Sequence, residues 1–361
     1  MSLIKRLFTA LFGAERASQV LLYTLRVVGN LPAGNWFLRK IYGVKSPSLE
    51  REVFGLRFRN PIGMAAGFDR NGEVFRTLDA LGFGFVEIGT VTPRPQQGNP
   101  RPRMFSLNKD RAILNRVGLA NKGLESVLAN VRDEHKNIIL GCNIGKNTVT
   151  PIEEAPADYL RVFRNLYQYI DYFAVNVSYN TTHSQYIPRN RESILAILEP
   201  LFEFRRGQNQ YRPILLKISP DLTNEEIDLM TDIMVDTPLD GIIATNASTC
   251  TEGLATSKRK LQRYGSGAVS GAPITARAIE VVRRVHERCN GTYPIIGSGG
   301  IMSGKDAKAM LDAGATLVQV YTGMVYEGIG FAGNICKHLL RAEATTDTTT
   351  DTTTDTTTTE A

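Results

Sequence analysis

Hydrophobic positions recur along this chain with two different patterns, which divide it into two parts. In the first 45 residues apolar side chains recur every three or four positions. This spacing predicts helices over 3–12 and about 15–28, the first of them amphipathic, and a short aromatic, basic segment over 36–42. From Phe54 onward, short apolar runs that end in small or polar residues alternate with helical patterns. We therefore expect an N-terminal helical segment, residues 1–45, ahead of a differently built domain.

That second part repeats a strand followed by a helix. Apolar runs predict strands at 62–66, 85–89, 138–143, 173–177, 214–218, 241–245, 294–297 and 317–321. Helical patterns lie at 72–81, 122–132, 156–166, 192–204, 224–235, 273–287 and 305–313, with a final helix near 328–341. Eight strand–helix repeats predict an α/β fold, a (β/α)8 TIM barrel over residues 46–342. Its active site would lie at the C-terminal ends of the strands.

The two ends of the chain differ in charge. The whole chain has a net charge of +6, and residues 1–45 carry seven basic side chains against one acidic one, Glu15. No nucleic-acid-reading module accompanies this excess, so we expect no nucleic acid partner. The N-terminal helices either lie on an anionic membrane surface or form a cap on their own domain. Residues 343–361 are nearly a repeat of threonine and aspartate, which predicts a disordered tail.

Cysteine and hydropathy patterns exclude other classes of protein. The four cysteines, at 142, 250, 289 and 336, are too far apart for a zinc motif, so we expect free thiols in a reducing cytosol and no metal. No apolar run approaches the roughly 18 residues of a membrane-spanning helix.

Amides, hydroxyls and one lysine stand at the predicted strand ends. The absence there of a carboxylate pair or a histidine set argues against glycoside and metal-dependent hydrolysis. Asparagine donates and accepts hydrogen bonds and an ammonium group stabilises developing negative charge, which suits a flat heteroaromatic ring with imide edges. Asn143 and Asn176 could equally cap loops. Lys217 is harder to explain structurally, because buried lysine is rare without a partner or a function, and we predict that it takes part in catalysis.

Glycine-rich turns follow the last two predicted strands. One is 297–300 (GSGG) and the other begins at Tyr321-Thr322-Gly323. Either turn alone could simply reverse the chain, but the pair at neighbouring strand ends predicts the phosphate site of many barrels. A phosphate beside an amide-lined ring predicts flavin mononucleotide (FMN).

Seven short motifs along the chain point together to one enzyme family. They are 60–69 (NPIGMAAGFD), 89–96 (GTVTPRPQ), 115–118 (NRVG), 121–123 (NKG), 217–222 (KISPDL), 270–271 (SG) and 297–301 (GSGGI). In these motifs the chain resembles the dihydroorotate dehydrogenases. The segment 15–17 (ERA) is similar to the membrane-associated, quinone-using class, class 2, and the resemblance spans about residues 14–342.

The resemblance implies oxidation of dihydroorotate to orotate in pyrimidine (UMP) biosynthesis. It also implies that a base removes the C5 proton while hydride passes from C6 to flavin N5, and that a quinone arriving through the N-terminal helices reoxidises the flavin. We expect a monomer, peripheral on the cytoplasmic side of the cell membrane. The implied FMN site is Ala65, Ala66, Gly67, Thr90, Asn143, Asn176, Lys217, Thr245, Gly271, Gly300, Tyr321 and Thr322. The implied substrate site is Arg70, Asn115, Arg116, Val117, Gly118, Leu119, Asn176, Thr181, Asn246 and Ala247.

The chain departs from the family pattern at two places. Arg70 stands where the family has a lysine that meets the substrate. After the fourth strand the family has Asn-x-Ser-(Ser or Cys)-Pro-Asn, whereas residues 176–181 are NVSYNT. Aligned without a gap, Tyr179 replaces the Ser or Cys base and Thr181 the asparagine; with a one-residue deletion, Asn180 keeps the asparagine role. Ser178 is a further candidate base, and an FMN barrel with another substrate or without turnover is the alternative.

Overall fold

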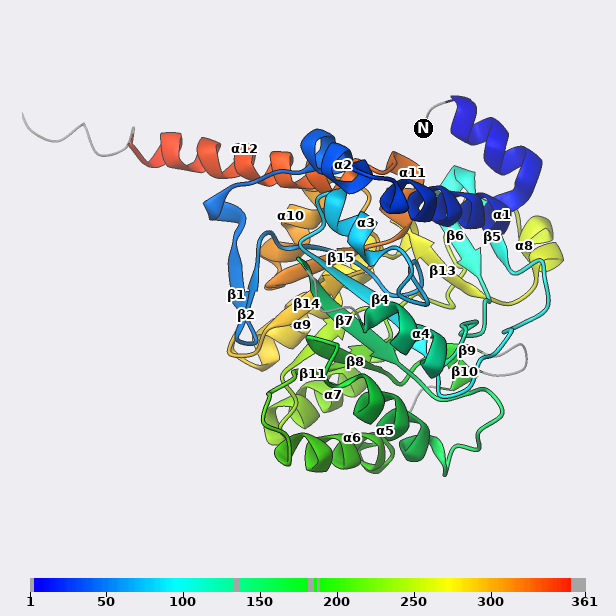
Figure 1. The fold of residues 1–361 in the computed structure, drawn as a ribbon, viewed down its shortest axis with the longest axis vertical. Helices are drawn as coiled ribbons and strands as arrows, with labels where there is room; N and C mark the ends of the chain where they lie inside the picture. Colours follow the sequence, from blue (N-terminus) through cyan, green and yellow to red (C-terminus); the bar gives the residue numbers. More distant parts are fainter. Residues whose placement is uncertain (1–2, 133–136, 181–184, 187–188, 352–361) are drawn as a thin grey trace, which may run out of the picture.

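The computed structural model describes residues 3–132, 137–180, 185–186 and 189–351, and the side chains within 15–345 except those of 133–136 and 179–188. Eight parallel strands close into a barrel (Figure 1), as the strand–helix repeat predicted. Around the barrel in chain order these are β3 (Ile62–Met64), β4 (Phe85–Val91), β7 (Ile139–Ile144), β8 (Tyr172–Asn176), β11 (Ile214–Ile218), β12 (Gly241–Ala244), β14 (Ile295–Ser298) and β15 (Leu317–Val320).

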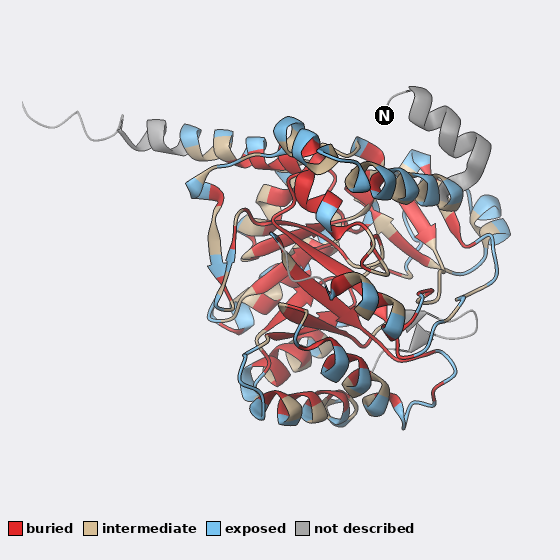
Figure 2. Ribbon diagram, in the orientation of Figure 1, coloured by how far each residue is buried: buried red, intermediate tan, exposed pale blue. Residues whose placement is uncertain are grey.

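Helices cover the outside of the barrel, so every residue of its eight strands is buried except Ile139, as Figure 2 illustrates. They are α3 (Phe75–Ala80), α4 (Leu124–Val131), α5 (Ala155–Leu166), α6 (Arg191–Arg206), α7 (Asn224–Asp236), α9 (Thr275–Arg288), α10 (Gly304–Asp312), α11 (Thr322–Glu327) and α12 (Phe331–Asp351). Local sequence fixes several starts: the Thr223 side chain and Glu226 form a capping box on α7, and Ser303 caps α10.

A hairpin closes the N-terminal end of the barrel. Strands β1 (Arg51–Val53) and β2 (Leu56–Phe58) pair antiparallel and bring Val53 and Phe58 against the lowest inward-facing side chains. Phe58 meets Phe85 edge to face, with ring centroids 5.3 Å apart. This end of the barrel is therefore filled with apolar side chains, and the opposite end is free to hold a site.

A small antiparallel sheet stands at the other end. It is formed by β5 (Met104–Leu107), β6 (Ala112–Asn115) and β13 (Ala268–Gly271), in the order β13-β6-β5. Strands β5 and β6 thus lie within the long connection, residues 92–123, between β4 and α4. A second hairpin pairs β9 (Tyr179–Asn180) with β10 (Gln185–Tyr186), and helix α8 (Lys258–Tyr264) precedes β13.

Two predictions about the ends of the chain were wrong. The segments expected at 3–12 and 15–28 are one helix, α1 (Leu3–Asn30), followed by α2 (Gly34–Tyr42). The last helix, α12, ends at Asp351 rather than near Arg341, so the first part of the expected disordered tail, 343–351, is helical. Threonine and aspartate are poor helix formers, but a helix already anchored by buried residues such as Ile335 and Leu339 can continue outward. Residues 352–361 lie outside the described part of the chain.

Candidate active site

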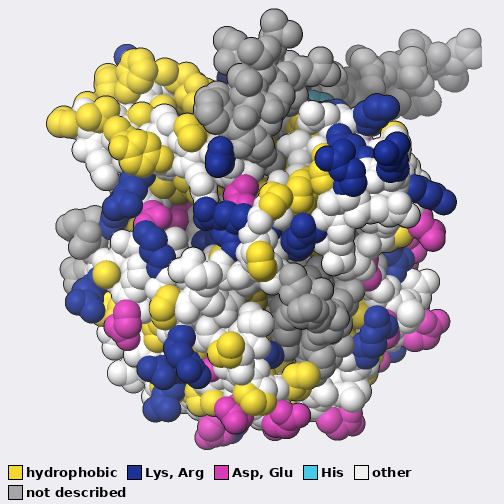
Figure 3. All heavy atoms as spheres, turned by 90° about the vertical axis from the view of Figure 1, so that its right-hand side faces the viewer, with side chains coloured by type: hydrophobic (Ala, Val, Ile, Leu, Met, Phe, Trp, Pro, Cys, Tyr) yellow, Lys and Arg dark blue, Asp and Glu magenta, His cyan; other side chains and the backbone are white. Residues whose placement is uncertain are grey.

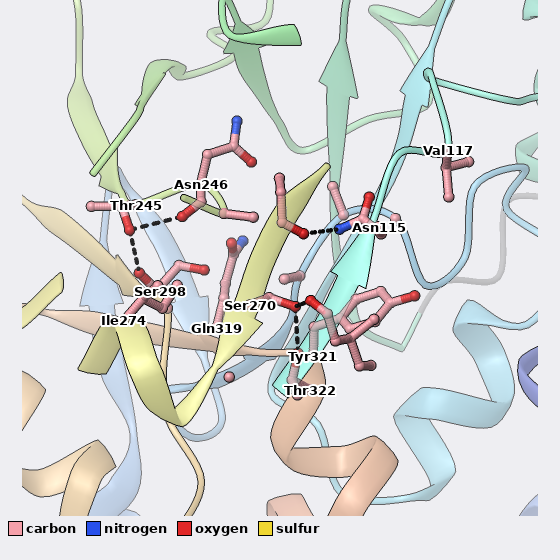
Figure 4. A pocket seen from close by; sticks show the side chains of 18 of the residues that line it. Asn115, Val117, Thr245, Asn246, Ser270, Ile274, Ser298, Gln319, Tyr321 and Thr322 are labelled. Carbon is pink, nitrogen blue, oxygen red and sulfur yellow. Dashed lines mark hydrogen bonds between the residues drawn. The ribbon is translucent and has the colours of Figure 1, made fainter. Parts of the chain in front are cut away.

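A cavity opens at the C-terminal ends of the barrel strands, with the small sheet along one side (Figure 4). The barrel supplies amide, hydroxyl and lysine side chains, and the small sheet adds Met104, Ile113 and Ser270. Glycines at 299, 300 and 323, where β14 and β15 end, also line it. This is the location that the strand-end argument predicted.

The cavity brings together nearly all of the site residues predicted from sequence. Every residue of the implied FMN site lines it: Ala65, Ala66, Gly67, Thr90, Asn143, Asn176, Lys217, Thr245, Gly271, Gly300, Tyr321 and Thr322. So do these residues of the implied substrate site: Arg70, Asn115, Arg116, Val117, Gly118, Leu119, Asn176, Asn246 and Ala247. Thr181 and the side chain of Tyr179 lie outside what the structure describes. The individual roles of these residues remain predictions.

A directed chain of hydrogen bonds crosses the cavity wall. The Asn246 amide nitrogen donates to the Asn176 side-chain oxygen at 3.0 Å, and the Asn176 nitrogen donates to the Thr90 hydroxyl at 3.3 Å. The Thr90 hydroxyl in turn donates to the Asn143 side-chain oxygen at 2.6 Å. Residues from four separate strand ends are thereby held in one network. The alternative that Asn143 and Asn176 only cap loops does not account for these contacts between strands. Asn176 does make one local loop contact as well, because its side-chain oxygen accepts from the Ser178 backbone N–H.

A charged cluster lies one layer below. Inward-facing residues of a barrel strand follow each other two positions apart, and Phe85 and Leu215 of the apolar end are followed by Glu87 and Lys217. The Lys217 ammonium donates to Glu87 Oε1 at 3.1 Å, and the two side chains are 5% and 0% exposed. Glu87 is the partner that a buried lysine requires.

Three further side chains complete this cluster. Glu87 Oε1 also accepts from Asn143 Nδ2 at 2.9 Å, while Glu87 Oε2 accepts from Gln319 Nε2 at 2.6 Å and from the Tyr172 hydroxyl at 3.3 Å. Burial and the neighbouring Glu87 raise the pKa of Tyr172 well above its ordinary value, so its hydroxyl remains a donor. Sequence reasoning missed Glu87, although the signal that singled out Lys217, a lone charge in an apolar strand, is equally present in 85–89 (FVEIG).

Two polar atoms at the cavity have no partner within the described part of the chain. They are Gln319 Oε1 and Ser178 Oγ, both buried, on residues that line the cavity. An unpaired buried polar atom costs about 1–3 kcal/mol, so such atoms at a cavity indicate hydrogen bonds completed by a bound molecule. The donor set of amides, hydroxyls and one ammonium fits a planar ring with imide edges.

The strand ends of β14 and β15 are held rigidly (Figure 4). The Thr245 hydroxyl donates to the Ser298 carbonyl at 3.2 Å, and the hydroxyls of Ser270 and Thr322 lie 2.8 Å apart. Gly300 has φ +72°, and a Cβ there would come within 2.4 Å of the Thr275 Cα. Glycine is therefore required at this turn.

Comparison with known proteins identifies the family. The family model for dihydroorotate dehydrogenase matches residues 48–342. The chain belongs to the dihydroorotate dehydrogenase family.

Curated relatives of this chain are named as quinone-dependent enzymes. A dihydroorotate dehydrogenase (quinone) of Christiangramia forsetii is 42% identical over 316 residues, covering 88% of this chain and 92% of the relative. That of Thermosynechococcus vestitus is 44% identical over 312 residues, covering 84% of each. The crystal structure of the Eimeria tenella enzyme in complex with ferulenol superposes with a TM-score of 0.81 at 32% identity, covering 92% of both chains. The chain therefore belongs to class 2 of this family, the quinone-dependent enzymes. These enzymes use a flavin to oxidise dihydroorotate with quinone in pyrimidine biosynthesis.

The N-terminal helix of this dihydroorotate dehydrogenase reaches the cavity. Burial raises the pKa of Tyr321, while the positive charge of Arg70 and hydrogen bonds with Ser18 and Arg70 act in the opposite direction. Ser18 belongs to α1 and Tyr321 lines the cavity, so α1 contacts the cavity wall. Glu15 of α1 also accepts from the buried Arg103 Nε at 2.9 Å, which ties the helix to the segment leading into β5.

Hydrophobic side chains remain exposed on these helices. The exposed large apolar residues of α1, α2 and the link between them are Val20, Tyr23, Val27, Leu31, Trp36, Phe37 and Ile41. Figure 3 shows hydrophobic side chains gathered at one end of the molecule, with lysine and arginine side chains below them. None of the helices in the described part of the chain has the length and apolar content needed to cross a bilayer.

Proposed function

We propose that the flavin of this dehydrogenase is FMN and that it binds in the cavity within the domain 46–342. Lys217, Asn143 and Gln319 would meet the ring, because their polar ends converge beneath the cavity and Gln319 Oε1 lacks a partner in the described chain. The phosphate would lie at Gly271, Gly300, Tyr321 and Thr322, where glycine backbones and hydroxyls meet at two strand ends. When bound, the flavin supplies an acceptor for the two electrons that leave the substrate.

Dihydroorotate would lie on the exposed side of the ring, between the barrel and residues 115–119. Asn115, Asn176 and Asn246 offer amide groups to its carboxylate and imide edges, and Arg70 offers a positive charge. Arg70 Nε donates to the Gly67 carbonyl at 3.1 Å, which fixes the guanidinium beside the cavity. The apolar neighbours Leu119 and Val117 would exclude water from the reacting carbons.

The proton at C5 of the substrate needs a base, and this chain has two candidate hydroxyls. Tyr179 occupies the position of the family's base in a gap-free alignment. Ser178 is favoured by a separate observation: its Oγ is buried, unpaired in the described chain and on a residue that lines the cavity. Lys217 and Arg70 supply positive charge near the cavity, which favours deprotonation of either hydroxyl.

Residues 1–45 would place the enzyme on the membrane and admit quinone. The exposed apolar residues of α1 and α2 and the basic excess of this segment suit an anionic lipid surface, and the contact of Ser18 with Tyr321 leads from α1 to the cavity. We propose a monomer that binds the cytoplasmic side of the cell membrane peripherally.

The observation that carries this proposal is the convergence of the predicted residues on one cavity with unpaired polar atoms. Single-turnover reduction of the bound flavin by dihydroorotate, without oxygen, tests it. We expect bleaching of the flavin absorbance, slowed at least about a hundredfold by loss of the true base, in line with general-base contributions of 10²–10⁴. Tyr179→Phe and Ser178→Ala identify which hydroxyl is that base.

Each outcome of this experiment has a distinct meaning. If neither variant is slower than the natural enzyme, neither hydroxyl is the base. Bound flavin that dihydroorotate never bleaches would show that the departure at 176–181 has changed the substrate or abolished turnover, and other pyrimidines and amides would then be tested for flavin reduction.

A further inference from the structure

We propose that Glu87 is a positioning residue for this reaction: from below the cavity it orients the hydrogen-bonding groups that face the flavin and balances the charge of Lys217. The inference rests on the flavin site proposed above. Glu87 itself does not line the cavity, but three of its four partners do, namely Lys217, Asn143 and Gln319.

The carboxylate fixes the direction of each partner because it can only accept. Its two oxygens receive four donors, two each, from Lys217, Asn143, Gln319 and Tyr172. An amide that turns its nitrogen toward Glu87 must turn its oxygen away. Gln319 consequently presents Oε1, the atom without a partner in the described chain, to a donor of a bound ligand.

The same constraint continues along the cavity wall. With its nitrogen on Glu87, Asn143 offers its oxygen to the Thr90 hydroxyl, whose own oxygen then accepts from Asn176. Asn176 is thereby left with its oxygen for Asn246. Donor and acceptor roles are set one after another from Glu87 outward to Asn246.

Charge gives Glu87 a second effect. A flavin bound there would gain electron density on reduction, and the positive charge of Lys217, which lines the cavity, would stabilise it. An ammonium buried without a counter-charge gives up its proton readily, because desolvation disfavours the charged form. Glu87 therefore balances the charge of Lys217 and holds its ammonium group at the floor of the cavity.

The test compares Glu87→Gln with Tyr172→Phe in the flavin-loaded protein. Glu87→Gln keeps the size of the side chain and removes its charge, whereas Tyr172→Phe removes another contact of the same carboxylate and leaves both charges in place. The flavin content, the visible spectrum and the flavin reduction potential are measured across neutral and mildly alkaline pH.

We expect the potential of Glu87→Gln to fall more steeply with rising pH than that of the natural protein, as Lys217 loses its proton. The Tyr172→Phe profile should run parallel to the natural one. A Glu87→Gln protein that holds FMN and shows the natural pH profile would overturn the inference, since Glu87 would then only fill space. A natural protein that takes up no flavin would instead refute the proposed function.

A second variant decides the matter if Glu87→Gln does not fold. The pair Glu87→Gln/Lys217→Met removes both charges, so no unpaired ammonium stays buried. Recovery of a cooperative melting transition in the double variant supports the charge balance. A double variant that also fails to fold contradicts it, because Glu87 would then act through packing and neutral contacts.

Discussion

Single residues at the floor of the cavity combine two roles, because the groups that face a ligand also belong to the barrel interior. Lys217 is 4% exposed and its ammonium is bonded to a carboxylate that is fully buried. Burying two charges is costly and is tolerated only when each satisfies the other. Activity and stability are therefore coupled at this position.

Replacing Lys217 with methionine should lower the free energy of unfolding by about 3–5 kcal/mol, because it leaves Glu87 charged and without its ion-pair partner in the interior. Urea denaturation of the purified variant measures this loss. Lys308→Met is the matched control: its ion pair with Asp312 is exposed, with side-chain exposures of 43% and 59%, and should cost less than about 1 kcal/mol. Equal losses for both variants would contradict the buried-pair account.

A site residue can be recognised from sequence where a charged side chain stands in an otherwise apolar strand. Lys217 stands out in 214–218 (ILLKI) and was predicted, whereas Glu87 was missed although it stands out equally in 85–89 (FVEIG). Tyr172 and Gln319 could not be recognised in this way, since tyrosine and glutamine in a strand need no special explanation. Their roles follow from four strands meeting in three dimensions.

Among the elements, the small sheet β13-β6-β5 determines the shape of the cavity opening. Its strands come from two loops far apart in sequence, and the register sets Gly271 opposite Ala112. Barrel strands could be predicted because buried parallel strands are continuous apolar runs. The pairing of β13 with β6 could not, because short strands within loops have neither the length nor the alternation that reveals their partners.

Gly271→Ala should destabilise both the sheet and the flavin site. Gly271 has φ 106° and ψ −157°, a conformation essentially restricted to glycine and costing other residues about 1–3 kcal/mol. A Cβ there would also lie 2.4 Å from the Arg111 carbonyl oxygen. We expect a lower melting temperature. We also expect FMN to bind at least about tenfold more weakly, since a loss of about 1.4 kcal/mol within that range raises the dissociation constant tenfold.

Gly207→Ala provides the control for that substitution. Gly207 has φ −86°, and a Cβ there would make only an ordinary contact, 3.6 Å from the Phe204 carbonyl oxygen. Its melting temperature and flavin affinity should match those of the natural protein. Natural flavin retention in Gly271→Ala would refute the role assigned to this strand end.

On the scale of the whole molecule, apolar surface is concentrated on the N-terminal helices. Trp36, Phe37 and Ile41 of α2 are 60%, 58% and 50% exposed. Replacing all three with serine should reduce binding to anionic phospholipid vesicles by at least about tenfold, because each buried apolar side chain contributes about 1.5–3 kcal/mol. Sedimentation with vesicles measures this.

Val149→Ser/Ile152→Ser is the control for surface hydrophobicity in general. These residues are 78% and 46% exposed and precede α5. Vesicle binding should not change in this variant. In both this variant and the α2 variant, dihydroorotate should reduce the flavin as it does in the natural enzyme. Vesicle binding that survives the α2 substitutions would contradict the membrane role proposed for residues 1–45.

We propose that a flavin sits where the eight strands converge and passes electrons from dihydroorotate to quinone. The visible absorption spectrum of the purified protein, recorded without oxygen before and after dihydroorotate and again after a soluble quinone, tests it most directly. We predict a yellow protein that dihydroorotate bleaches and quinone restores to yellow. A colourless protein that cannot take up FMN, or a flavin spectrum that dihydroorotate leaves unchanged, would contradict the claim.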